Sequence, residues 1–240
     1  MKQRLCAALL LSCAALASRL FAQDESNQVG SVEGVVRFRG EIPKSANADD
    51  AGVRRDLLEV DRETHGLRYV VAYLLPADGP SNSSPAAAIE KPRITVDQQD
   101  YAFVPRVIAV REGEPVSFTN SDPANHNVRT ASAVAKNEFN VFTGTGGNYE
   151  HRFAATPRRR PIQLTCDIHP WMRGWIHVFD HPRFAVTDKR GMFRIPPVPP
   201  GKYKLLLEQP DISYLHEQII IVAKGQPTKV ELEARTGTDR

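Results

Sequence analysis

The 240-residue chain carries 31 Lys and Arg against 28 Asp and Glu, a formal net charge of +3. Three of these cations, Lys2, Arg4 and Arg19, lie among the first 22 residues, which hold no acid, so the rest of the chain is formally neutral. That balance gives no indication of nucleic-acid binding. No apolar run beyond the N-terminal one approaches the roughly 20 residues that span a bilayer, so we expect no transmembrane segment in the mature chain.

The N-terminus predicts an export signal. A basic start at residues 1–4 precedes an apolar core at 5–17, and Leu20-Phe21-Ala22 resembles a small-residue cleavage site. We expect a signal peptide over 1–22, cleavage after Ala22, and a periplasmic or secreted protein. The lipobox-like Leu10-Leu11-Ser12-Cys13 leaves a lipoprotein anchored through Cys13 as an alternative.

Beyond the leader, short alternating runs punctuated by Gly, Pro and Asn predict an all-β chain. The clearest runs are 93–96, 107–110, 116–119, 149–153, 162–166 and 175–179. We expect a β-sandwich, with a single short helix near 50–60.

The most specific motif is Cys-x-x-His-x-x-Met at Cys166, His169 and Met172, with His126 lying 40 residues upstream of the cysteine. One thiolate, two imidazoles and a thioether are the donors of a blue-copper site, although thiolate and imidazole also suit zinc. His126 follows a turn-rich stretch at 120–125, and period-2 alternation places Cys166 on the apolar face of its strand. After cleavage Cys166 is the one cysteine left, so we expect it to be metal-bound or, alternatively, buried and inert.

The region 92–180 resembles the cupredoxins, in particular the amicyanin and plastocyanin group. The matching motifs are 101–105, 110–120, 126–128 and 166–174. The resemblance implies a Greek-key β-sandwich that binds one type 1 copper ion through His126, Cys166, His169 and Met172. It implies that Asn127 locks the two ligand-bearing loops together, and that electrons enter through an apolar patch at Pro170 and Trp171.

The flanking segments resemble a carboxypeptidase regulatory-like, or transthyretin-like, β-sandwich. The matching stretches are 29–38, 69–75, 187–195 and 199–205. We expect a discontinuous domain made of 29–79 and 183–234, with the copper module inserted between linkers at 80–85 and 181–182 and a tail at 235–240. Two domains in series are the alternative arrangement.

One strand supports an interface between these parts. Trp175 and His177 replace the smaller or apolar residues usual in cupredoxins, and with Phe179 they form an outward stripe that the outer domain is expected to cover. The remaining histidines, His65, His151, His181 and His216, lack ligand spacing and are expected to be ordinary. The basic run 158–160 is expected to be a solvated turn.

These patterns predict an exported type 1 copper protein that acts in one-electron transfer with an unidentified redox partner, and no enzymatic activity. A cell-surface or periplasmic binding module in which copper is accessory is the first alternative. A thiol enzyme that uses Cys166 with a histidine base is the second, but it gives Met172 no role.

Overall fold

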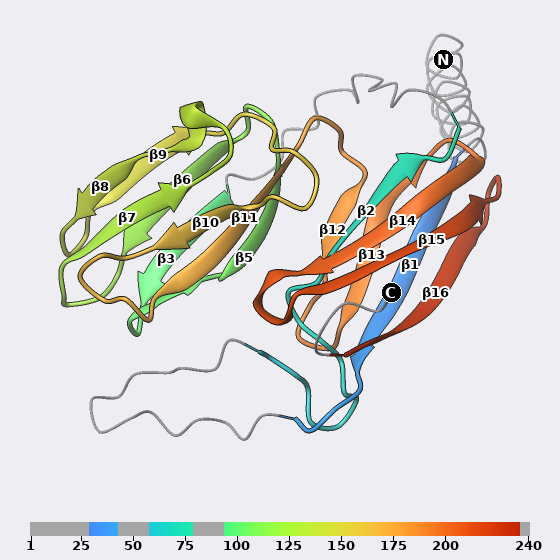
Figure 1. Ribbon diagram of the computed structural model, residues 1–240, viewed down its shortest axis with the longest axis horizontal. Coiled ribbons are helices and arrows are strands. Elements are labelled where there is room, and N and C mark those ends of the chain that lie inside the picture. The colour runs from blue at the N-terminus through green and yellow to red at the C-terminus, as the bar shows by residue number, and fades with distance from the viewer. Residues whose placement is uncertain (1–28, 43–57, 79–93, 236–240) are drawn as a thin grey trace, which may run out of the picture.

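The computed structural model describes residues 29–42, 58–78 and 94–235, and every regular strand in these ranges belongs to one of four sheets (Figure 1). The predicted leader, Cys13, the linker at 80–85 and most of the tail lie outside the described residues, as does most of the predicted helix at 50–60. Val60, at the end of that predicted helix, forms a β-bridge with Leu67 instead. Among the described residues, no helix is long and apolar enough to cross a membrane.

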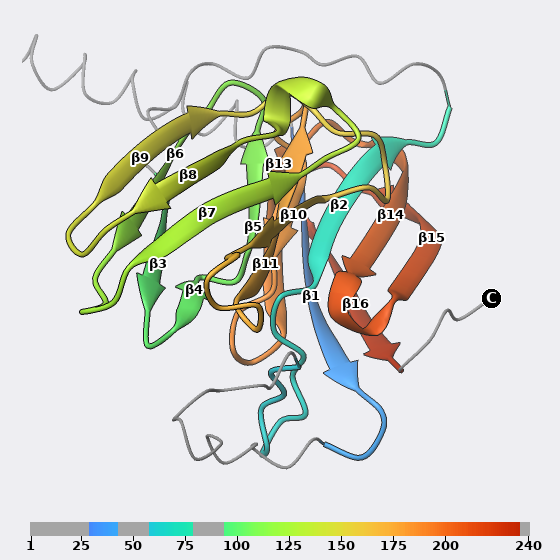
Figure 2. The same cartoon turned by 60° about the vertical axis from the view of Figure 1, so that its left-hand side comes forward.

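Two sheets are built from the ends of the chain. One has the order β13 (Met192–Val198), β1 (Gly30–Phe38) and β16 (Pro227–Ala234), and the other has the order β12 (Phe184–Val186), β2 (Val71–Pro76), β14 (Gly201–Gln209) and β15 (Tyr214–Val222). Strand β1 pairs antiparallel with β13 and parallel with β16. Figure 2 shows the blue β1 among these orange and red strands. We call this unit the outer domain.

The outer domain has a core of its own. Buried side chains from both of its sheets, among them Val32, Leu74, Ile195 and Leu205, form one apolar cluster. The alternation of β1 explains part of this cluster, because Val32, Val36 and Phe38 share one face of the strand and are fully buried.

The nine intervening strands form the other two sheets. The order of the larger one is β5 (Val107–Arg111), β11 (Arg173–Phe179), β10 (Ile162–Thr165), β7 (His126–Ala131) and β8 (Asn140–Thr143). The order of the smaller one is β4 (Ala102–Val104), β3 (Ile94–Gln99), β6 (Pro115–Asn120) and β9 (Asn148–Arg152). A separate apolar cluster that contains Phe118, Leu164 and Ile176 fills the space between them. We call this unit the central domain.

Strand β11 belongs to two cores at once. Ile176 and Val178 face the core of the central domain, while the alternate side chains Trp175 and Phe179 join a third cluster with residues of β2, β12 and β14. His177, between them, is only 4% exposed. The prediction that another part of the chain covers this stripe is confirmed.

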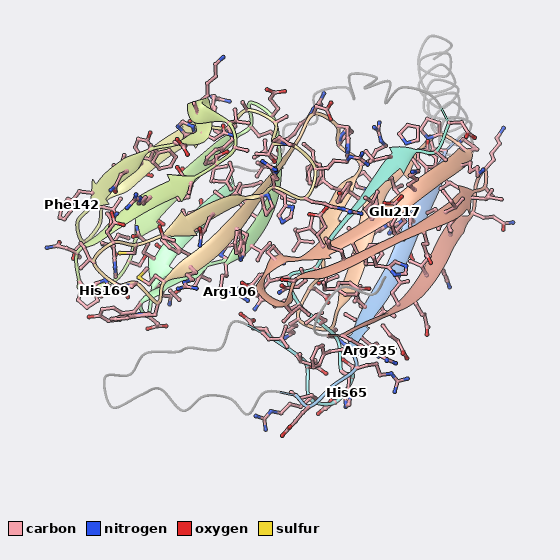
Figure 3. The ribbon with its side chains drawn as sticks, viewed as in Figure 1. His65, Arg106, Phe142, His169, Glu217 and Arg235 are labelled. Atoms are coloured by element: carbon pink, nitrogen blue, oxygen red, sulfur yellow. The ribbon has the colours of Figure 1, made fainter. Side chains whose placement is uncertain are left out.

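A polar clamp closes the same interface. Arg106, just before β5, forms a buried ion pair with Asp211 in the short 3-10 turn η2 (Pro210–Ile212). Asp211 also accepts a hydrogen bond from the indole Nε1 of Trp175 at 2.8 Å. Figure 3 shows Arg106 on the side of the central domain that faces the outer one. The two domains are therefore joined by a charged contact as well as an apolar one.

Candidate metal centre

Three side chains with metal-binding donors converge at one end of the central domain. His126 begins β7, Cys166 follows β10, and His169 lies in the loop that leads to β11. The Cys166 Sγ atom lies 3.9 Å from Nδ1 of each histidine, and the two Nδ1 atoms are 2.9 Å apart. Figure 3 shows His169 at the end of this domain, away from the outer domain.

The His126 ring is held by a carboxylate. Its Nε2 atom lies 2.8 Å from Oδ2 of Asp122, which is itself buried. The two carboxylate oxygens of Asp122 also accept the backbone N–H groups of Asp100 and Tyr101, at 2.7 and 3.0 Å. Because Nε2 is engaged in this way, Nδ1 is the atom left to face the cysteine.

The turn that carries Asp122 is fixed by Asn120. The Asn120 amide nitrogen donates to the carbonyls of Ala124 and Thr143, each at 2.9 Å, and its Oδ1 accepts from the Asp122 backbone N–H at 3.0 Å. Sequence reasoning identified this stretch only as a turn before His126 and missed the role of Asp122. The available signal was an acidic residue four positions before a candidate ligand.

Asn127 connects the two ligand-bearing segments. Its Oδ1 atom accepts the backbone N–H of Asp167 at 2.7 Å and lies 3.4 Å from the Cys166 Sγ atom. Its amide nitrogen donates to Asn140 and Asp167. Hydrogen bonds from Arg129 and Asn140 lower the pKa of the Asp167 carboxyl. Asn127 thus ties β7 to the loop that begins at Cys166.

Met172 closes that loop. Its backbone N–H donates to the carbonyl of His169 at 2.9 Å, and its carbonyl accepts from the Cys166 N–H at 3.4 Å. The side chain is 1% exposed and packs in the same cluster as Cys166. A buried thioether in the same cluster as the cysteine could serve as a weak fourth ligand.

Aromatic and apolar side chains surround the exposed end of the site. Tyr101 meets the rings of His126 and His169 edge-on, with centroids 5.6 and 5.0 Å apart. Of the residues expected to form the patch where electrons enter, Pro170 is exposed and Trp171 is half-buried, with its ring 5.2 Å from that of His169.

Two exposed apolar residues at this end were missed from the sequence. Ile168, in the ligand loop, is 49% exposed, and Phe142, opposite Asn127 in the β7–β8 pair, is 65% exposed. Nothing in a run such as Asn140–Thr143 indicates that Phe142 pairs across the sheet with a residue next to a metal-binding histidine.

The donor set fits one metal ion. Metal–nitrogen distances of about 2.0 Å and metal–sulfur distances of about 2.3 Å place such donors about 3–4 Å apart. A thiol with two imidazoles, and a buried thioether nearby, is consistent with a type 1 copper site. Within the described ranges this is the one group of three His, Cys, Asp or Glu side chains at metal-binding spacing, and the other five histidines lie outside it.

Comparisons with known proteins cover part of the chain. No protein-family model matches the sequence, and neither does any curated protein. Among solved structures, a Cu-containing nitrite reductase (NirK) from Thermus scotoductus SA-01 is 26% identical, with a TM-score of 0.34, over 40% of this chain and 24% of that one. This chain thus spans about a quarter of the reductase.

Two smaller proteins are matched over nearly their whole length. A purple cupredoxin from Nitrosopumilus maritimus is 22% identical, with a TM-score of 0.31, over 36% of this chain and 99% of that one. A mutant of amicyanin in the reduced state is 23% identical, with a TM-score of 0.32, over 45% of this chain and 99% of that one. By its own two sheets and its His–Cys–His cluster, the central domain is a cupredoxin-like portion of an all-β chain.

Proposed function

We propose that this protein is an exported one-electron carrier that binds a single type 1 copper ion in its central domain. The ligands are His126, Cys166 and His169, with Met172 in the axial position. The observation that carries this proposal is the convergence of the Cys166 thiol with the Nδ1 atoms of both histidines. When bound there, copper supplies reversible one-electron chemistry.

The surrounding residues suit a carrier because they hold the ligands still. Asp122 orients the His126 ring, and Asn127 fixes the start of the ligand loop. A site whose ligands are already in place changes little when the charge of the metal changes, which favours rapid electron transfer. Held by these three donors and Met172, the ion would have no coordination position left for a substrate, which favours a carrier over an enzyme.

The apolar end of the domain suits a transient partner. Ile168 and Pro170, which flank His169 in the loop, are exposed, and so is Phe142 on β8; an apolar surface allows close approach without desolvating charges. Weak redox encounters need less interface area than stable complexes. We therefore place electron exchange at this end, with a redox partner protein.

Two further assignments belong to the proposal. The leader at residues 1–22 directs export, with cleavage after Ala22, and the outer domain is a carboxypeptidase regulatory-like scaffold made of 29–79 and 183–234. A fusion of residues 1–28 to a reporter that is active only outside the cytoplasm tests the first. An inactive reporter would contradict export.

The copper assignment is tested by spectroscopy of the chain that begins at residue 23. Loaded with Cu(II), it is expected to show the intense visible thiolate-to-copper band, which Cys166→Ser abolishes. Met172→Leu is the matched control, because it alters the same loop but leaves the three equatorial donors and the colour. If the wild-type protein stays colourless when loaded with copper, the proposal of an electron carrier is wrong, and a surface-binding module is favoured instead.

A further inference from the structure

A cavity of about 540 Å³ lies between the two domains, on the interface that carries β11. The outer domain contributes Tyr73, Leu75, Lys204 and Glu208, and the central domain contributes residues 155–161 and 177–181. We call it the interdomain pocket. Its volume lies within the range of small-molecule sites, which form preferentially at domain interfaces.

The floor of the interdomain pocket holds three buried polar side chains. The Tyr73 hydroxyl donates to Oε1 of Glu208 at 2.5 Å, and Oε2 of Glu208 lies 3.8 Å from Nδ1 of His177. Tyr73, His177 and Glu208 are each no more than 5% exposed. Since such groups cost free energy when buried, a floor of this kind is unusual at a contact that served only to hold two domains together.

One atom of this floor has no partner. The Nε2 atom of His177 is buried and makes no hydrogen bond to any described residue. Burial lowers the pKa of His177 to about 3, so its ring is neutral near pH 7. That Nε2 atom is closed to solvent, so a ligand in the pocket would meet other atoms of the ring, and unpaired buried polar atoms are rare.

The rim of the interdomain pocket is basic. Arg158, Arg159, Arg160 and Lys204 line it, against the acidic side chains Asp180 and Glu208. Glu217, labelled in Figure 3, pairs with both Arg159 and Lys204 at 3.3 Å, whereas Arg158 and Arg160 form no ion pair with the described residues. The positive charges of Arg158 and Arg159 reach the floor, since both act to lower the pKa of Glu208 against the larger raising effect of its burial.

Aromatic side chains also line the interdomain pocket. Phe179 is 4.9 Å from the Tyr73 ring and stacks on His181, with 5.2 Å between centroids. Flat apolar surfaces of this kind favour a planar ligand body.

We propose that the interdomain pocket binds a small organic anion with a planar apolar body. Its carboxylate lies at Arg158 and Lys204, and its ring lies against Phe179. Because the walls come from both domains, binding also holds them together.

The test is calorimetric titration of the copper-loaded chain with 4-hydroxybenzoate, which carries the carboxylate and the ring. Saturable binding with a dissociation constant at or below about 1 mM is expected. Inorganic phosphate, which lacks the ring, and neutral 4-hydroxybenzamide, which lacks the charge, should each bind at least tenfold more weakly. If either binds equally well, the proposed ligand class is wrong.

Variants locate the binding. Arg158→Gln combined with Lys204→Gln should weaken 4-hydroxybenzoate binding at least tenfold, while Arg194→Gln, an exposed position on β13 outside the interdomain pocket, should leave it unchanged. All three positions lie on the surface, so the variants should fold. Undiminished binding by the double variant, a change in the copper band on binding, or no binding by the wild type would overturn the proposal.

Discussion

The ion pair between Arg106 and Asp211 predicts that removing a single charge greatly lowers the stability of the protein. Asp211→Asn keeps the shape of the side chain and an oxygen acceptor for the Trp175 indole, but removes the negative charge that faces Arg106. The side chains of Arg106 and Asp211 are only 9% and 3% exposed. The substitution therefore removes the charge of Asp211 from beside a guanidinium that is almost fully buried.

The size of the effect follows from that burial. Removing one member of a buried ion pair costs roughly 3–5 kcal/mol, and because asparagine preserves one hydrogen bond we expect about 2–4 kcal/mol here. For a chain of this size each kcal/mol lowers the melting temperature by about 2–4 °C, so Asp211→Asn should melt about 5–15 °C lower.

The assay is thermal unfolding of the copper-loaded protein, followed by tryptophan fluorescence, because Trp175 lies in the clamp. The matched control is Glu233→Gln, which breaks the ion pair between Glu233 and Arg39. The side chain of Arg39 is 62% exposed and that of Glu233 is 47% exposed. An exposed pair contributes little to stability, so the melting temperature of the control should shift by no more than about 4 °C. Equal shifts in the two variants would refute the argument from burial.

The double substitution Arg106→Met with Asp211→Leu separates two explanations of that loss. Replacing a buried ion pair by apolar side chains is often nearly neutral, whereas stranding one charge is not. The double variant should therefore recover more than half of the stability that Asp211→Asn loses. A further loss would show that the hydrogen bonds, rather than the stranded charge, dominate.

Three other predictions concern the metal site and the interface. Asp122→Asn should weaken copper binding by roughly 10–100-fold and raise the reduction potential, because the carboxylate makes His126 a stronger donor; an unchanged affinity in a copper-chelator competition would contradict this. Phe142→Glu should slow electron self-exchange between oxidised and reduced protein, measured by NMR, with the visible band unchanged; a rate equal to that of the wild type would move the exchange site elsewhere. The pKa of His177 falls from 6.5 in the unfolded chain to about 3 in the folded one, so the unfolded state binds more protons between these values. His177 therefore contributes stability above pH 6.5 that is lost as the pH falls, by up to roughly 4–5 kcal/mol at pH 3, and His177→Gln should flatten urea midpoints measured across this range.

The ligand set could be predicted from the sequence because most of it is local. Cys166, His169 and Met172 share one seven-residue loop, and side-chain chemistry limits what such a loop can bind. His126 was found because a turn-rich stretch ended a strand before it. The alternation of β11 likewise revealed an outward stripe, since a period of two is visible in five residues.

The residues that support the site could not be found in this way. Asp122 holds His126 only because the backbone at Asp100 and Tyr101, more than 20 residues upstream, turns back to donate to its carboxylate. Arg106 and Asp211 are 105 residues apart, and nothing in either neighbourhood indicates the other. Such contacts depend on how sheets are placed in space, which composition and periodicity do not encode.

The clamp also lies close in the chain to the metal loop. Trp175, three residues after Met172, donates its backbone N–H to the carbonyl of Arg106 at 2.9 Å and its indole N–H to Asp211. Gly174, which precedes Trp175, packs tightly against the same backbone: an added Cβ would come within 2.7 Å of the Arg106 carbonyl oxygen. The end of the ligand loop is thus fixed by a residue that the outer domain holds in place. All three clustered donors come from the central domain, and the outer domain contributes the Asp211 carboxylate that holds Trp175 on β11.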